Sequence, residues 1–247
     1  MRIYPTMELQ NGRCVTLDKG RLDEAMIWHV NPTETARSWA AAGAEWMHLT
    51  DFDAIEGRDT NTELVEEIIR TAEMPVQLAG GMRTREKVEH WIDKGAGRVV
   101  IGTLAAWDPN LVKELAKLYP DQIVLAVDVW QGFVMTEGWR NQSAFTPEAF
   151  IDAFADAPLA AILVTDINSD MEDVEAQLGL ISGLAQHSRT PVIASGVVRT
   201  ADDISRLAYI PNIAGALVGR SLFRKMLDLN EALEVATAAH EPVAQFQ

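Results

Sequence analysis

The chain has 247 residues, of which 48% are hydrophobic and 23% are charged, and this composition excludes a disordered or collagen-like protein. It carries 36 acidic and 21 basic residues, and the formal net charge of −15 argues against a nucleic-acid partner or an anionic membrane surface. The single cysteine, Cys14, excludes an intramolecular disulfide, and the first residues lack the apolar stretch of a signal peptide, so we expect a cytoplasmic protein.

Eight short apolar segments predict β-strands that are buried on both faces, because they are rich in Val, Ile and Leu. In chain order these segments are 3–9, 46–50, 75–78, 99–101, 123–127, 161–164, 191–194 and 214–218. Longer amphipathic segments between them predict helices over 32–42, 61–72, 84–94, 110–118, 146–155, 173–186, 200–208 and 222–238. Pro32 after Asn31 and Pro147 after Thr146 mark two helix starts.

This alternation of strands and helices predicts the fold class. Eight βα units of about 31 residues each favour an α/β protein with one domain, a single (β/α)8 TIM barrel over residues 1–247. An open, doubly wound sheet is the alternative, but no GxGxxG motif follows the first strand to support it.

The two halves of the chain resemble each other, which predicts an internal duplication of a half-barrel at about 1–118 and 119–247. Residues 80–84 (GGMRT) match 196–200 (GVVRT) at an offset of 116 residues. Residues 100–104 match 217–221 less closely, at an offset of 117. Glu8 corresponds to Asp128, and each of these acids ends an apolar strand.

Each half places glycine-containing turns after its third and fourth strands, and such turns expose backbone N–H groups that bind phosphate. In barrels of this type phosphate sites lie in the loops after strands seven and eight, and the duplication predicts a second site after strands three and four. Arg83 and Arg199 accompany the two turns. We therefore expect a small, elongated substrate with a phosphate at each end.

Glu8 and Asp128 are expected at the C-terminal ends of strands one and five, where carboxylates of this fold usually belong to the active site. Two carboxylates on opposite sides of a substrate can divide the work, one accepting a proton and the other donating one. Thr165 ends strand six and can hydrogen-bond the substrate or orient Asp128. Trp139 can stack on a flat heterocycle or pack its loop onto the barrel.

The sequence predicts no metal site. Asp51 and Asp53 form a pair of carboxylates without a third ligand at a suitable spacing, and no two of the five histidines have ligand spacing. His48 is interpreted as a hydrogen-bonded residue of the barrel wall.

Seven segments together resemble the ProFAR isomerase family of histidine biosynthesis, and they span the chain nearly from end to end. They are PTMELQNG at 5–12, LTDFDA at 49–54, VQLAGGMR at 76–83, RVVIGT at 98–103, AVDV at 126–129, GW at 138–139 and TDI at 165–167. Each segment is also similar to the sister cyclase subunit, and the Gly138-Trp139 pair favours the isomerase.

The resemblance implies an Amadori rearrangement of ProFAR to PRFAR, in which an aminoaldose becomes an aminoketose without a cofactor. It implies that Asp128 is the general acid that protonates the ring oxygen, that Glu8 stands at the position of the base that removes the C2 proton, and that Thr165 assists. The binding loops implied by the resemblance contain Asp51, Gly81, Arg83, Gly102, Thr103, Ser195, Gly196, Gly219 and Arg220. We add Trp139 and Asp170 as binding candidates and expect a monomer.

Three positions depart from the family pattern. Glu8 replaces the family's aspartate and reaches roughly 1.5 Å further. Asp170-Met171-Glu172 replaces Asp-Gly-Thr, and Val197 replaces the second glycine of the turn after strand seven. A valine resists positive φ and Glu172 adds a negative charge, so the second phosphate site is predicted to be weaker than the first.

These departures keep two other functions open beside the isomerase. One is a divergent paralogue that isomerises a different sugar phosphate, which Val197 and Glu172 favour. The other is a barrel that binds phosphosugars without catalysis. Glu8 supports it only weakly, because an inactive site more often loses its carboxylates than exchanges one for another.

Overall fold

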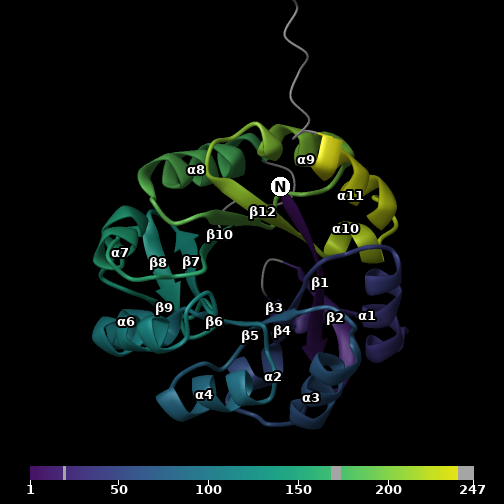
Figure 1. Cartoon of the computed structure of the whole chain (residues 1–247), viewed down its shortest axis with the longest axis horizontal. Helices are drawn as coiled ribbons and strands as arrows, with labels where there is room; N and C mark the ends of the chain where they lie inside the picture. The colour runs from purple at the N-terminus through teal and green to yellow at the C-terminus, as the bar shows by residue number, and fades with distance from the viewer. Residues whose placement is uncertain (19–20, 168–173, 239–247) are drawn as a thin grey trace, which may run out of the picture.

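The computed structural model of the protein describes residues 1–18, 21–167 and 174–238. Its main strands are β1 (Arg2–Gln10), β4 (Met47–Asp51), β5 (Val76–Ala79), β6 (Arg98–Ile101), β7 (Ile123–Trp130), β10 (Ala161–Asp166), β11 (Val192–Ser195) and β12 (Ile213–Val218). They are parallel and hydrogen-bonded in this order, and the pairs β12–β1 and β7–β10 close the wall (Figure 1). The predicted eight-stranded barrel is therefore confirmed.

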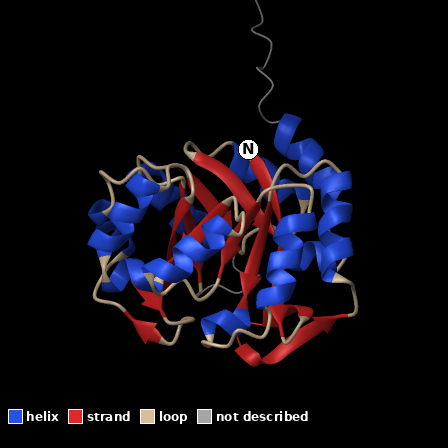
Figure 2. Ribbon diagram, turned by 60° about the horizontal axis from the view of Figure 1, so that its bottom comes forward, coloured by secondary structure: helices blue, strands red, loops and turns tan. Residues whose placement is uncertain are grey.

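Helices surround this wall on its outer side, as Figures 1 and 2 show. The longer ones are α1 (Pro32–Ala41), α3 (Thr62–Thr71), α4 (Arg85–Asp93), α6 (Pro109–Leu118), α7 (Pro147–Ala153), α8 (Val174–His187), α9 (Ala201–Ala208) and α11 (Leu229–Ala238). Three short helices, α2 (Phe52–Ile55), α5 (Thr103–Trp107) and α10 (Arg220–Phe223), follow β4, β6 and β12 directly and were not predicted. No helix in the described parts of the chain is long and apolar enough to cross a membrane.

The prediction of one continuous helix over 222–238 was wrong. α10 ends at Phe223, because Lys225 turns the chain through a left-handed conformation with φ of 55°. Asp228 then starts a new helix, since its side chain accepts a hydrogen bond from the backbone N–H of Asn230 at 2.9 Å. The two predicted helix starts were right: the Asn31 side chain accepts from the N–H of Glu34, and that of Thr146 accepts from Ala149.

Two hairpins extend the barrel beyond the first strand of each half. β1 continues into β2 (Arg13–Asp18) and β3 (Arg21–Trp28), and β7 continues into β8 (Phe133–Thr136) and β9 (Asn141–Gln142). Asn11-Gly12 and Gln131-Gly132 turn the chain, and all four residues have positive φ between 48° and 81°, as type I′ turns require. The same hairpin at the same place in both halves supports the proposed duplication.

The alternation of side chains along β1 decides which residues face the barrel interior. Met7 and Leu9 are fully buried in the outer core between strands and helices. Thr6 and Glu8, which alternate with them, point inward and line the central cavity. Burial of Met7 and Leu9 in the outer core therefore turns the side chain of Glu8 toward the cavity.

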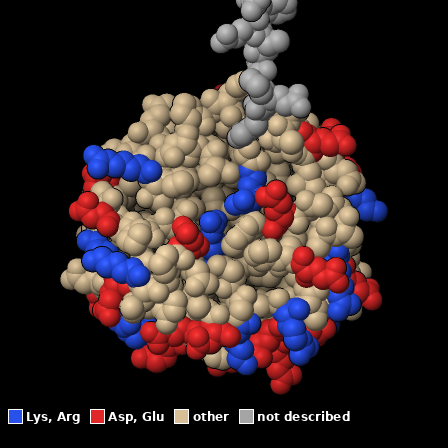
Figure 3. Space-filling view, viewed as in Figure 1, with Lys and Arg blue, Asp and Glu red and all other residues tan. Residues whose placement is uncertain are grey.

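Aromatic and charged side chains fill the N-terminal end of the barrel. The Arg98 guanidinium lies 4.7 Å from the centre of the Trp46 ring and donates a hydrogen bond of 3.2 Å to the Tyr4 hydroxyl. Arg2 forms an ion pair with Glu45 at 3.1 Å. Figure 3 shows basic and acidic side chains together in the middle of the face that it presents. Above this layer the interior is apolar, with buried residues such as Val124 and Ile193.

The loop after β5 depends on a glycine with no room for a side chain. Gly80 has φ of +116°, and a Cβ atom there would lie 2.4 Å from the backbone oxygen of Asp51. The corresponding Gly196 has φ of +83° but nothing within 4 Å of a Cβ atom. We expect Gly80→Ala to lower the free energy of unfolding by about 2–4 kcal/mol, because it adds a backbone clash to the unfavourable φ.

Gly196→Ala is the matched control for this prediction, since it carries only the cost of a left-handed alanine, about 1 kcal/mol. Urea denaturation of the two variants measures the difference. Equal destabilisation of both would show that the loop after β5 shifts to accept a side chain.

Candidate active site

A cavity of about 540 Å³ opens at the C-terminal ends of the barrel strands. Every strand of the wall, or the loop directly after it, contributes to its lining; examples in ring order are Glu8, Thr50, Gly81, Gly102, Asp128, Thr165, Ser195 and Gly219. The cavity therefore draws on both halves of the chain, as the sequence predicted for a duplicated barrel.

Most of the predicted site residues lie at this cavity. Besides Glu8, Asp128 and Thr165, the lining contains Gly81, Arg83, Gly102, Thr103, Trp139, Ser195, Gly196, Gly219 and Arg220. Asp51 is not among the lining residues, and Asp170, with Met171 and Glu172, lies outside the described residues.

Glu8 and Asp128 face the same cavity from opposite sides of the wall. Glu8 belongs to β1 and Asp128 to β7, and three strands separate β1 from β7 in either direction around the ring. Both side chains line the cavity. A ligand that fills the cavity is therefore enclosed between two carboxyl groups.

Burial in the cavity wall raises the pKa of Glu8 from 4.5 to about 7. Two contacts oppose this effect, because the Arg220 guanidinium attracts the carboxylate and the backbone of Leu17 donates a hydrogen bond to it. Glu8 is thus poised to exchange a proton near neutral pH, which suits a general base.

Burial also raises the pKa of Asp128 above its usual range. The Trp139 and Thr165 side chains donate hydrogen bonds to the carboxylate and partly offset the effect of burial. Thr165 is the neighbour of Asp128 across the β7–β10 pair. Of the two roles predicted for Thr165, the structure shows the one in which it orients Asp128.

Trp139 is positioned by a loop with an unusual backbone. Glu137, Gly138 and Trp139 have consecutive φ values of 57°, 67° and 66°, a conformation that bulky residues rarely adopt. The backbone N–H of Glu137 donates to the Thr103 hydroxyl at 2.8 Å, and Arg140 forms an ion pair with Glu56 at 2.9 Å. These contacts hold the indole ring at the cavity beside Asp128.

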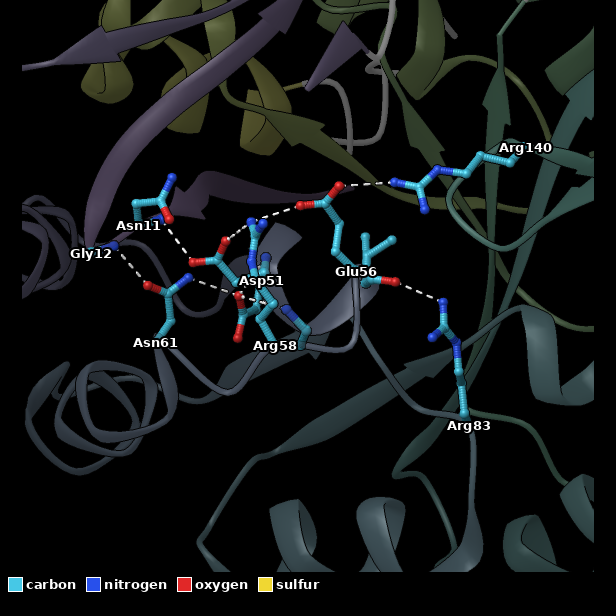
Figure 4. Close-up of polar contacts among 11 residues, drawn as sticks. Asn11, Gly12, Asp51, Glu56, Arg58, Asn61, Arg83 and Arg140 are labelled. Atoms are coloured by element: carbon cyan, nitrogen blue, oxygen red, sulfur yellow. Dashed lines mark hydrogen bonds and ion pairs between the residues drawn. The ribbon is translucent and has the colours of Figure 1, made fainter. Parts of the chain in front are cut away.

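In the described structure Asp51 makes structural contacts and is not among the residues that line the cavity, so the binding role implied for it stays a prediction. Its side chain is buried and accepts hydrogen bonds from the backbone N–H groups of Asp53 and Ala54, which caps α2. It also accepts from the Asn61 side chain at 2.8 Å, and Asn61 in turn accepts from the backbone of Gly12 (Figure 4). This network joins the end of β4 to the hairpin after β1.

The loop after β5, in the first half of the chain, presents Arg83 to the cavity in a fixed position. Arg83 donates a hydrogen bond of 2.6 Å to the backbone oxygen of Ile55, and Figure 4 shows its side chain reaching toward that segment. Gly80 and Gly81 before it both have positive φ, at 116° and 70°. The turn therefore has the conformation that the double glycine predicted.

The corresponding loop after β11, in the second half of the chain, has Val197 where the loop after β5 has Gly81. Gly196 has φ of 83°, whereas Val197 does not adopt the left-handed conformation of its counterpart Gly81. Val197 is instead buried, with 1% of its surface exposed. The two turns that correspond in sequence therefore cannot present the same pattern of N–H groups to an anion.

Hydrogen bonds join Gln77, His48 and Thr50 along the cavity wall, and the sequence predicted only part of this arrangement. His48 is buried, with its Nδ1 3.0 Å from Gln77 Nε2 and its Nε2 3.0 Å from the Thr50 hydroxyl, as the interpretation of a hydrogen-bonded barrel residue required. Burial lowers the pKa of His48 to about 3, so the ring is neutral. The inward alternation of β4 was the available signal that His48 and Thr50 line the cavity.

Within the described residues, no group of three or more His, Cys, Asp or Glu side chains is placed to hold a metal ion. The polar groups at the cavity include carboxylates, hydroxyls, backbone N–H groups, a histidine, a glutamine and two arginines. This set is suited to proton transfer and to the binding of anions.

Comparisons with known proteins agree with this site. Residues 2–228 match the family described as histidine biosynthesis protein. The chain is 78% identical over 247 residues to a protein of Ruegeria pomeroyi and 69% identical over 246 residues to one of Ruegeria sp., with all of each chain covered. A protein of Caulobacter vibrioides is 41% identical over 96% of this chain and 100% of its own. All three are named isomerases of an imidazole-4-carboxamide that carries 5-phosphoribosyl and 5-phosphoribosylamino groups.

Proposed function

Since the chain belongs to the histidine biosynthesis protein family, we propose that its two facing carboxylates catalyse the conversion of ProFAR to PRFAR. The chain is an isomerase of histidine biosynthesis, as its relatives are. The observation that carries the proposed mechanism is the placement of Glu8 and Asp128 on opposite sides of one cavity.

Asp128 starts the proposed reaction as a general acid. Burial raises the pKa of Asp128, and its protonated form donates a proton to the ring oxygen of the ribosylamine while the bond between that oxygen and C1 breaks. The lone pair of the glycosidic nitrogen forms the C1=N bond of an iminium ion. The Trp139 and Thr165 hydrogen bonds then stabilise the Asp128 carboxylate that remains.

Glu8 completes the rearrangement as a general base. Its carboxylate removes the proton from C2, and the electron pair of that C–H bond neutralises the iminium ion to give an enaminol. The enaminol becomes the aminoketose when C1 gains a proton and the C2 hydroxyl loses one. The substrate is isomerised with no net gain or loss of protons, and the enzyme is reset when a proton passes from Glu8 to Asp128 through solvent.

The substrate's two phosphates fit the two glycine loops of the barrel mouth. We place one phosphate near Gly81, Gly102 and Thr103, and the other near Ser195, Gly196 and Gly219, because these residues line opposite parts of the cavity. This arrangement holds the reacting ribose between the carboxylates.

The two phosphate sites are expected to differ in strength. A crystal soaked with sulfate or phosphate should show stronger density beside Gly81 and Gly102 than beside Gly196 and Gly219, because only the first turn has two left-handed glycines. Occupancies refined at several anion concentrations measure the difference. Equal occupancy at both sites, or preference for the second, would contradict it.

The test of the function is rescue of a histidine auxotroph that lacks its isomerase, together with conversion of ProFAR by the purified protein. Growth that is lost in the Asp128→Asn variant supports the proposal. Phosphosugar binding without growth or conversion of ProFAR would favour one of the two alternatives, a divergent isomerase or a non-catalytic barrel. Val197 supports the first of these and Glu8 weakly supports the second. A monomeric state and a place in the cytoplasm remain proposals from the sequence, and size-exclusion chromatography tests the first.

A further inference from the structure

Three groups meet at the Glu8 edge of the cavity and belong to three different elements. Glu8 lies near the end of β1, Leu17 in β2 of the first hairpin, and Arg220 at the start of α10. The Glu8 carboxylate accepts a hydrogen bond from the backbone of Leu17, and the Arg220 side chain donates one to the backbone oxygen of Leu17. Arg220 also attracts the Glu8 carboxylate electrostatically, so Leu17 is bonded to both residues while the charge of Arg220 acts on Glu8.

The resemblance implied that Arg220 belongs to a binding loop for the substrate or its phosphates, and these contacts point to another task. One of its terminal nitrogens is committed to the Leu17 oxygen, and its charge acts on Glu8. The phosphate loops of the second half retain their backbone groups at Gly196 and Gly219, which do not need this side chain.

We propose that Arg220 is a positioning residue that holds the Glu8 carboxylate ionised and directed at the substrate: its charge acts on the carboxylate across the cavity edge, and its side chain is anchored to the Leu17 backbone, which is also bonded to Glu8. The glutamate side chain reaches roughly 1.5 Å further from the backbone than an aspartate would, which brings its carboxylate nearer to these two partners. The consequence for catalysis rests on the proposed function, because it takes Glu8 as the base.

Arg220 is the charged group whose attraction opposes the burial of Glu8, and the surrounding groups do not replace it. His48 on β4 is neutral, since burial lowers its pKa to about 3. The other charged or titratable side chains that line the cavity come from the loop after β5, from β7, from the loop after β8 and from β10; they are Arg83, Asp128, Glu137 and Asp166. Three of these four are acidic and would favour protonation of Glu8 rather than its ionised form.

The first test compares the pH dependence of kcat/KM for wild type, Arg220→Met and Arg220→Lys. Without the guanidinium the pKa of Glu8 rises, so the acid limb should move up by about one pH unit. The loss should be about fivefold at pH 7, because the ionised fraction of Glu8 falls from about one half to about one tenth, and it should nearly vanish at pH 9. Arg220→Lys should recover part of the shift because it restores the charge, but not the wild-type rate, because lysine cannot serve both partners in the same way.

Arg224→Met is the matched control, since Arg224 lies one turn further along the chain, is exposed and does not line the cavity. It should leave the acid limb unchanged. An Arg220→Met variant with an unmoved acid limb and a raised KM would overturn the proposal and restore Arg220 as a phosphate ligand. Thermal unfolding of each variant identifies any loss of activity that comes from unfolding. If Arg220→Met is unfolded, the position of the acid limb in Arg220→Lys tests the proposal instead.

A second measurement separates this proposal from the proposed function. In protein labelled with ¹³C at the glutamate carboxyl groups, the signal absent from Glu8→Gln belongs to Glu8 and can be titrated without substrate. Its midpoint should lie near pH 7 in wild type and higher in Arg220→Met, but not in Arg224→Met. This result would stand even if the protein failed to convert ProFAR, whereas an unchanged Glu8 midpoint in Arg220→Met would refute the proposal.

Discussion

Replacing Asp128 with asparagine is expected to lower kcat by about 10³-fold, the range that a positioned general acid contributes. Asparagine has nearly the same shape and can still accept the Trp139 and Thr165 hydrogen bonds, but it has no acidic proton to donate to the ring oxygen. KM should change little, because the loss concerns the transition state. Steady-state conversion of ProFAR measures both constants.

Asp121→Asn provides the control for this substitution. Asp121 precedes β7 at the opposite end of the barrel, is exposed and has φ of 60°, a conformation that asparagine tolerates well. It should retain full activity. Normal kcat in Asp128→Asn would show that the ring oxygen receives its proton from another group.

Replacing Glu8 with glutamine is expected to reduce kcat/KM by a similar factor and to remove the acid limb of its pH profile. Glu8 acts as a base only in its ionised form, and its pKa is raised to about 7. On the acid side of the profile, wild-type kcat/KM should therefore fall as the pH drops through about 7. His48 does not account for this limb, because its pKa lies near 3.

Glu8→Asp tests whether the site is built for the longer side chain. Aspartate retracts the carboxylate by roughly 1.5 Å from the Leu17 and Arg220 contacts. A displacement of about 1 Å in a reacting group can cost ~100-fold, so we expect a loss of that size despite the conserved charge. A variant with faster turnover than wild type would instead identify Glu8 as an imperfect substitute for aspartate.

The barrel and the pair of acids could be predicted from the sequence because both depend on local patterns. Alternation of strands and helices at a regular length leaves few other folds, and the period of two along β1 turns Glu8 inward when Met7 and Leu9 pack outward. The position of a residue at a strand end then places it at the mouth of the barrel. Glu8, Asp128 and Thr165 were located by this reasoning alone.

A local pattern does not decide which partner a side chain takes when several are within reach. Asp51 also ends a strand, but the short helix that follows offers its carboxylate two backbone N–H groups, and the acid caps α2 instead of reaching the cavity. Helices as short as α2 and α10 leave no periodic pattern to detect. The electrostatic attraction between Arg220 and Glu8 joins residues 212 positions apart, which no local pattern reveals.

The unequal turns at Gly81 and Val197 have a consequence for the direction in which a ligand enters. A barrel with two identical halves has pseudo-twofold symmetry, and an elongated molecule charged at both ends could bind it equally well in reverse. In the reversed pose the acid and the base would exchange their places relative to the sugar, and every such encounter would be unproductive. Unequal turns, together with the different groups that the substrate carries next to its two phosphates, would give the two poses different binding free energies, so that one orientation of the substrate is preferred.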